Sequence, residues 1–322
     1  MRYTIVMKSI ISMSALLSIA LYPIITNHLA SADVRLSSLF ISSNASLLPS
    51  SAEPAEVRAF AEKIRQQLSA QAPFASWKKA DMNIKPLGPG THSWLVSFAQ
   101  NGEEAGYAVI SASEDGGYQL VEYGGKGSSL FSDQMLRQAL TNLHLTDDAQ
   151  LEYQFLYGGP LLAEWRIHQK DNNQAAAIYV DALTGEVLPE TDETWQQQTN
   201  GQPYAIHESA ISSKDVTYKP SSAVFTASAF DPYDNMMWLA AKPLEIKDSL
   251  SFQSILIKNK QLVFTTKGDK RTYQIPLSVS GYQKWTAANG NARSPVYVSV
   301  GTEQSRFILI NTLLSGGQFY KY

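Results

Sequence analysis

The feature that most constrains the fold is an amphipathic helical pattern followed by short alternating strands. In its first occurrence, Ser51-Ala52-Glu53-Pro54 predicts a helix start, with a serine cap, an acid near the positive end and proline in the first turn. Pro73 ends this helix. Five apolar residues repeat on one helical face: Val57, Phe60, Ala61, Ile64 and Leu68.

Alternating apolar residues after this helix predict three strands. Asn101-Gly102 and Asp115-Gly116 are turn signals between them, which favours an antiparallel meander. The sequence also allows an earlier strand near Met82–Ile84 without deciding whether it forms. The expected strands cover 93–100, 105–113 and 118–123.

The same order returns in the second occurrence. Ser132 is the expected cap of a second helix with a buried apolar stripe, and strands are expected over 151–157, 161–168 and 175–181. A meander has one face to bury, and one helix laid on it covers that face. Residues 52–190 therefore predict an α+β domain of two helix-on-antiparallel-meander units, αβββ twice.

The pattern changes after this domain. Residues 191–224 are polar and predict a linker. Residues 225–322 predict a mostly-β sandwich or barrel domain, and Leu250, Phe252 and Leu256 are interpreted as part of its strand alternation. One short helix is expected near 283–288.

The N-terminal 32 residues predict a signal peptide. Arg2 and Lys8 precede an apolar stretch, and Ala30-Ser31-Ala32 fits a signal-peptidase site. The alternative is an uncleaved membrane anchor. Residues 33–51 predict a tether, so the mature chain is expected to be secreted, extracellular or associated with the cell wall.

Composition excludes several classes of function. The chain has no cysteine, which excludes disulfides, thiolate metal sites, cysteine nucleophiles and lipid-modified cysteine. Loss of Arg2 and Lys8 with the signal peptide would change the net charge from −3 to −5. Nucleic acid and anionic membranes are therefore not expected as partners.

A family resemblance rests on Ala177-Ile178-Tyr179-Val180-Asp181-Ala182-Leu183-Thr184-Gly185-Glu186-Val187. This stretch resembles the closing strand and turn of PepSY-type domains. Residues 106–112 resemble a strand in propeptides of secreted bacterial peptidases, and residues 231–239 resemble a segment of secreted proteins of bacilli. PepSY-type domains are associated with holding or inhibiting peptidases, so the resemblance implies a secreted peptidase or an extracellular peptide as partner.

Three common catalytic and cofactor motifs are absent from the sequence. No Gly-x-Ser-x-Gly nucleophile turn occurs, and no two of the five histidines have the spacing of a zinc protease motif. The glycine-rich stretch 124–129 lacks the glycine and hydroxyl residues that a phosphate loop requires. No catalytic, metal or cofactor residue is therefore assigned.

One candidate binding surface is expected in the C-terminal domain. Its aromatic rings would stack on sugars or line a peptide groove, and its two acids are also the nearest candidates for paired carboxylates. The alternative is a capped turn beside packed aromatic residues. The residues are Asp231, Tyr233, Asp234, Trp238, Tyr282 and Trp285.

Together these observations predict a secreted non-catalytic binding protein, in which a PepSY-like module binds or inhibits a peptidase. The expected mechanism is recognition of an extended peptide at an exposed sheet edge. Three alternatives stay open at this point. They are a cell-wall or polysaccharide binder, a catalytically dead peptidase-like precursor, and a glycosidase that uses paired carboxylates.

Overall fold

The structure is a computed structural model that describes residues 54–88, 91–114, 116–127, 129–145, 150–172, 175–199, 210–214, 218–266, 273–287, 294–301 and 306–322. The chain divides into Met1–Asn44 and Ala45–Tyr322, and every described residue belongs to the second unit. The predicted signal peptide and tether lie outside the described residues. Helices and antiparallel sheets together confirm the α+β class.

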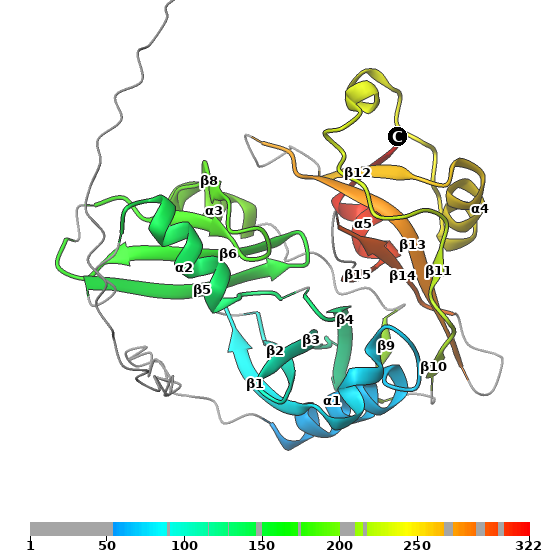
Figure 1. The fold of residues 1–322 in the computed structure, drawn as a ribbon, viewed down its shortest axis with the longest axis horizontal. Coiled ribbons are helices and arrows are strands. Elements are labelled where there is room, and N and C mark those ends of the chain that lie inside the picture. Colours follow the sequence, from blue (N-terminus) through cyan, green and yellow to red (C-terminus); the bar gives the residue numbers. More distant parts are fainter. Residues whose placement is uncertain are drawn as a thin grey trace, which may run out of the picture. The chain divides into compact units, whose positions relative to one another are not determined.

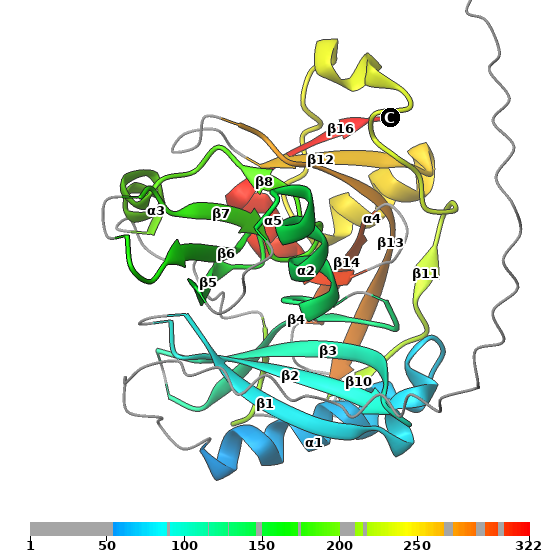
Figure 2. The ribbon, with the colours of Figure 1, turned by 60° about the vertical axis from the view of Figure 1, so that its left-hand side comes forward.

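The first helix-and-meander unit forms as expected, with one strand more than the three predicted. The additional strand covers the stretch near Met82 that the sequence left open. Figure 2 shows the helix α1 along one face of the strands β1 to β3. The elements are α1 (Ala55–Leu68), the 3-10 helix η1 (Phe74–Lys79), β1 (Asp81–Leu87), β2 (Ser93–Gln100), β3 (Glu103–Ala112) and β4 (Tyr118–Gly124).

The second unit repeats the first in outline, again with a fourth strand. Its helix lies over the strands β5 and β6 (Figure 1), and the short fourth strand follows the turn that carries the family resemblance. The sheet order is β5-β6-β7-β8. The elements are α2 (Asp133–Asn142), β5 (Leu151–Gly159), β6 (Leu162–Gln169), β7 (Ile178–Asp181) and β8 (Val187–Leu188).

The C-terminal strands do not form a separate sandwich or barrel but continue the first sheet. β15 pairs antiparallel with β4, with Arg306 opposite Gly124 and Ile308 opposite Glu122. The sheet order is β1-β2-β3-β4-β15-β14-β13-β12-β16. The new elements are β12 (Leu262–Thr266), β13 (Pro276–Ala287), β14 (Val296–Val300), β15 (Arg306–Leu309), α5 (Ile310–Gly316) and β16 (Gly317–Lys321).

The predicted linker is wrong for the parts of 191–224 that the structure describes. These parts contain a helix and three short strands, and all three strands add to the large sheet. Ile211 pairs with Leu120, Pro220 pairs with Trp285, and Val224 pairs with Tyr282. The polar composition led to the wrong prediction because strands of only two or three residues leave no alternating apolar pattern in the sequence. The elements are α3 (Asp192–Thr199), β9 (Ile211–Ser212), β10 (Tyr218–Pro220) and β11 (Val224–Phe225).

Two further predictions in the C-terminal part are wrong. Leu250, Phe252 and Leu256 lie on the helix α4 (Ser249–Asn259), not on a strand. Asp248 caps that helix by accepting a hydrogen bond from the Ser251 N–H at 2.7 Å, and Ser251 reciprocates. Residues 283–287, expected as a short helix, belong to β13.

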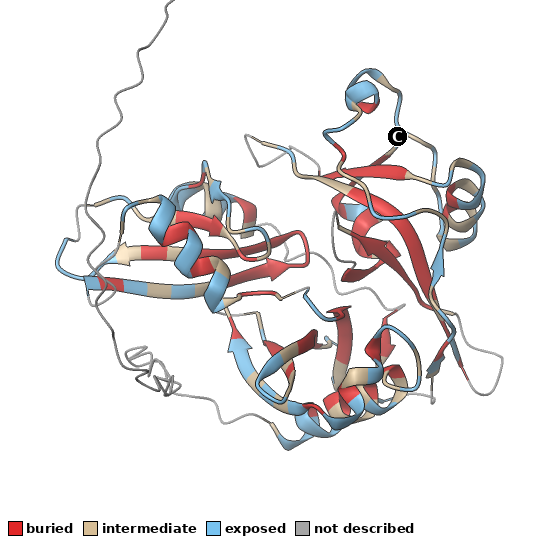
Figure 3. Ribbon diagram, viewed as in Figure 1, coloured by how far each residue is buried: buried red, intermediate tan, exposed pale blue. Residues whose placement is uncertain are grey.

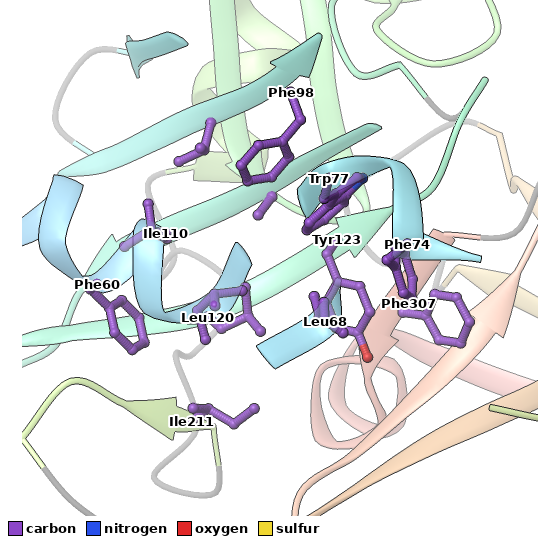
Figure 4. Close-up of a cluster of buried hydrophobic side chains, with 14 of the residues drawn as sticks. Phe60, Leu68, Phe74, Trp77, Phe98, Ile110, Leu120, Tyr123, Ile211 and Phe307 are labelled. Atoms are coloured by element: carbon purple, nitrogen blue, oxygen red, sulfur yellow. The ribbon is translucent and has the colours of Figure 1, made fainter. Parts of the chain in front are cut away.

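In the first meander, the strands β2 to β4 are buried on both faces, whereas the edge strand β1 is mostly exposed (Figure 3). Trp94, Val96 and Phe98 face α1, whereas Leu95 faces the second unit. Figure 4 shows Phe60 of α1 and Trp77 of η1 in the first of these clusters, with Phe307 of β15 contributing from the other end of the chain. This double burial makes the first meander the centre of the described structure.

Candidate functional site

The turn between β7 and β8 is organised by Asp181. Its Oδ1 accepts hydrogen bonds from the backbone N–H of Leu183 at 2.9 Å and of Thr184 at 2.7 Å. Gly185 adopts a φ of 73°, a region that favours glycine, and its N–H donates to the Asp181 carbonyl at 3.0 Å. Asp, Thr and Gly at these positions therefore have a local structural cause, and together they give the turn one fixed shape.

This turn places β8 as the outermost strand of its sheet. The Asp181 N–H donates to the Glu186 carbonyl at 2.8 Å, and Tyr179 pairs with Leu188. In an antiparallel ladder, hydrogen-bonded and non-hydrogen-bonded pairs alternate, so the intervening pair of Val180 and Val187 is not hydrogen-bonded. The N–H and C=O of Val187 therefore point away from β7, toward an edge that pairs with no other strand among the described residues.

A groove of about 450 Å³ lies beside this edge, between α2 and the turn. Met135 packs close to Gly185, because a Cβ added to that glycine would lie 3.2 Å from the Met135 Cε. The side chain of Val187 is half exposed and lines the groove. Gln138 and Asn142 of α2 line it as well and supply amide groups.

The register of β7 and β8 places the edge and the groove side by side, so that they form one site. Val187 lies opposite Val180, whose side chain is buried on the α2 side of the sheet, so Val187 points to that side too. A strand added outside β8 would place the residue opposite Val187 with its side chain on the same face. Main-chain bonds at Val187 and a side-chain contact in the groove would thus come from one bound segment.

The candidate surface predicted from the sequence is only partly assembled. Asp231 Oδ1 accepts a hydrogen bond from the Tyr233 N–H at 2.9 Å, and the Asp234 N–H donates to the Asp231 carbonyl at 3.2 Å. Trp238, in the 3-10 helix η3 (Met236–Ala240), is buried and donates from Nε1 to the Pro232 carbonyl at 2.9 Å. Of the two interpretations, the structure has the capped turn beside a packed aromatic residue.

Tyr282 and Trp285 are not part of that turn. Tyr282 is buried in the C-terminal cluster beside Phe252, and Trp285 is fully buried, with its Nε1 donating to the Tyr123 hydroxyl at 3.1 Å. Both lie on β13, a strand inside the large sheet. The six residues therefore make no common surface, and these two rings cannot stack on a ligand.

One pair of buried carboxylates was missed by the sequence. The Tyr273 hydroxyl donates to Glu190 Oε1 at 2.8 Å and lies 3.5 Å from Glu164 Oε1. Glu190 also accepts hydrogen bonds from Thr194 and Gln198 at 2.5 Å and 2.7 Å. Since these donors belong to the protein itself, the pair is a structural contact that joins β6, α3 and the segment just before β13.

Among the described residues, no group of three or more His, Asp or Glu side chains is placed to hold a metal ion. Within the same ranges, no helix is both long enough and apolar enough to cross a membrane. The open edge at Val187 and its groove were not predicted as site residues. The only sequence signal for them is the Asp-Ala-Leu-Thr-Gly-Glu-Val stretch itself, which fixes the turn.

Comparisons with protein-family models, with curated proteins and with solved structures find no match for this chain. The PepSY resemblance therefore stays a prediction.

Proposed function

We propose that the protein is a secreted, non-catalytic binding protein that takes an extended peptide segment onto the open edge of β8. The observation that carries the proposal is the outward N–H and C=O of Val187 beside a groove of about 450 Å³. An unpaired strand edge offers main-chain hydrogen bonds to any extended chain, and a groove beside it selects among side chains.

The partner is a secreted peptidase, and the support for this step is the resemblance of 177–187 to PepSY-type domains. The rigid turn adds a physical reason. Because Asp181 and Gly185 hold the edge in one shape before binding, little conformational entropy is lost there when a segment docks. The bound segment is a loop or terminus of the peptidase in extended form.

The proposal is tested by changing only the edge. Val187→Pro removes the outward N–H, which makes no bond to β7, so the ladder within the sheet keeps its hydrogen bonds. Val187→Thr is the matched control, because it retains the N–H and a β-branched side chain. Each protein is immobilised and exposed to culture supernatant of the producing bacterium, and bound proteins are identified by mass spectrometry.

The expected result is recovery of a peptidase by the wild type and by Val187→Thr, with at least tenfold less recovery by Val187→Pro. Secreted proteolysis, measured on casein, should fall on addition of the first two proteins only. Recovery of no peptidase together with unchanged proteolysis would refute the peptidase partner. Equal recovery by all three proteins would show that β8 is not the binding edge.

A further inference from the structure

The second sheet carries a row of polar side chains on the face opposite α2. Gln154 of β5 lies directly opposite Arg166 of β6, and Arg166 lies opposite Tyr179 of β7. Their neighbours Trp165 and Val180 point to the apolar cluster under α2. Because side chains alternate along each strand, the row of three points to the other face.

The helix α3 forms a wall above this row. Arg166 Nε and Nη2 donate to the two oxygens of Asp192 at 2.7 Å and 2.8 Å, and the Tyr179 hydroxyl donates to Asp192 Oδ1 at 2.5 Å. These hydrogen bonds lower the pKa of Asp192 to about 2, and the bond from Arg166 has the largest effect. Partial burial of the carboxyl opposes the shift. The carboxylate, the guanidinium and the phenol are thereby held in fixed positions.

A pocket of about 440 Å³ remains between the row and the helix. Its lining includes the ion pair and Tyr179, the amides of Gln154 and Gln196, and the half-buried indole of Trp195. The pocket is on the opposite face of the sheet from the groove at β8, so its ligand is independent of the function proposed above.

The chemistry of the lining narrows the class of ligand. The charge of Arg166 is matched by Asp192 at bidentate distance, so the pocket offers no excess charge to an anion or a cation. The floor of Gln154, Arg166 and Tyr179 is too polar for a purely apolar ligand. The planar polar groups, together with the indole of Trp195, fit a ligand that has hydroxyls around its edge and C–H groups on its face.

We propose that this pocket binds a sugar ring of a neutral glycan. The indole of Trp195 packs against the C–H face of the ring, while the amides of Gln154 and Gln196 and the Asp192 oxygens bond its hydroxyls. Of the C-terminal aromatic residues that the sequence pointed to for such a role, Trp238, Tyr282 and Trp285 are buried and only Tyr233 is exposed. The proposed site lies instead on the second meander.

The test uses the purified full chain and two neutral probes, cellotetraose and chitotetraose, titrated to millimolar concentration by calorimetry and by tryptophan fluorescence. Gln196→Ala and Gln197→Ala are a matched pair on α3. Both side chains are exposed, but only Gln196 lines the pocket. Trp195→Ala removes the stacking ring, and Gln154→Ala removes an exposed amide from the floor without removing core packing.

The expected result is saturable binding of at least one probe, unchanged in Gln197→Ala and about tenfold weaker in Gln196→Ala and in Gln154→Ala. Trp195→Ala should abolish both the binding and the fluorescence change. Cosedimentation with purified cell wall and with cellulose then separates a wall polysaccharide from a free oligosaccharide as the source of the sugar. Absence of saturable binding by both probes, or equal binding by all variants, would overturn the proposal.

Discussion

The carboxylate of Glu122 and the guanidinium of Arg306 form a buried ion pair, with 3.3 Å between Oε2 and Nη1. The hydroxyls of Tyr107 and Tyr157 each donate to Glu122 at 3.0 Å, and Arg306 Nη2 donates to the Pro160 carbonyl at 2.7 Å. Glu122 thus connects the first meander, the second meander and the C-terminal strands. Burial raises the pKa of its carboxyl, and the charge of Arg306 opposes that rise.

Glu122→Gln should be strongly destabilising, because it leaves the Arg306 charge buried without a counter-ion. The expected loss in the free energy of unfolding is about 3–5 kcal/mol. Tyr107→Phe, which removes one hydrogen bond to the same carboxylate, should cost only about 1 kcal/mol. Urea unfolding measures both values. In the double variant Glu122→Leu, Arg306→Met much of the lost stability should return, and an additive double loss would contradict this account.

Stability should depend on pH through Asp192 in acid. The pKa of this group is about 2 in the folded protein, held down chiefly by Arg166, against about 3.9 in an unfolded chain. A lowered folded-state pKa stabilises the protein above the unfolded value, and the stabilisation is lost as the pH falls from about 4 toward 2. Since the Asp192 side chain is 53% exposed, the effect should be about 1 kcal/mol.

Asp192→Asn provides the measurement for this prediction. The difference in free energy of unfolding between the wild type and the variant should be constant above about pH 5 and should shrink below about pH 4. A difference that stays the same down to pH 3 would show that the carboxylate charge makes no contribution through Arg166.

Gly185→Ala should cost more stability than Gly102→Ala, although the two glycines have similar φ angles of 73° and 80°. A Cβ at Gly102 would contact nothing within 4 Å, so that substitution measures the backbone cost alone, about 1–2 kcal/mol. At Gly185 the Cβ would also displace Met135. Thermal unfolding of both variants measures the difference in stability. Equal losses would show that Met135 of α2 can move aside without lowering the stability of the protein.

Leu188→Pro should destabilise the protein by about 1–2 kcal/mol, whereas Val187→Pro should change the free energy of unfolding by less than about 0.5 kcal/mol. The Leu188 N–H lies in the hydrogen-bonded pair with Tyr179, but the Val187 N–H points to the open edge. Hydrogen exchange gives an independent check, because the Leu188 amide should be protected and the Val187 amide should exchange freely. The reverse order would show that the register of β8 is misassigned.

The repeated helix-and-meander pattern could be predicted because its signals are local. The apolar positions of α1 lie within one segment, and hairpin residues such as Asn101-Gly102 directly join the strands that pair. In α4, the pattern of Leu250, Phe252 and Leu256 fits a strand in part, but the spacing of Phe252 and Leu256 also fits one helical face. Asp248 followed by Ser251 was the capping signal that would have decided between them.

The union of the first meander with the C-terminal strands has no local signal. Tyr123 and Phe307 stack at 5.1 Å although 184 positions separate them in the chain, and their strands are ordinary alternating strands when considered one at a time. The same limit applies to the candidate sites. Arg166 and Asp192 are an unremarkable pair of charged residues in the sequence, and only the fold brings them together.

The pairing of β4 with β15 has a consequence for how the chain reaches its native state. During synthesis, residues 118–124 are made long before residues 306–309 exist. Throughout that interval, the edge of β4 that pairs with β15 in the folded protein has no partner strand. An unpaired strand can capture the same strand of another molecule. A high concentration of unfinished or refolding chains should therefore favour aggregates over monomers. Dilution should raise the yield of folded monomer.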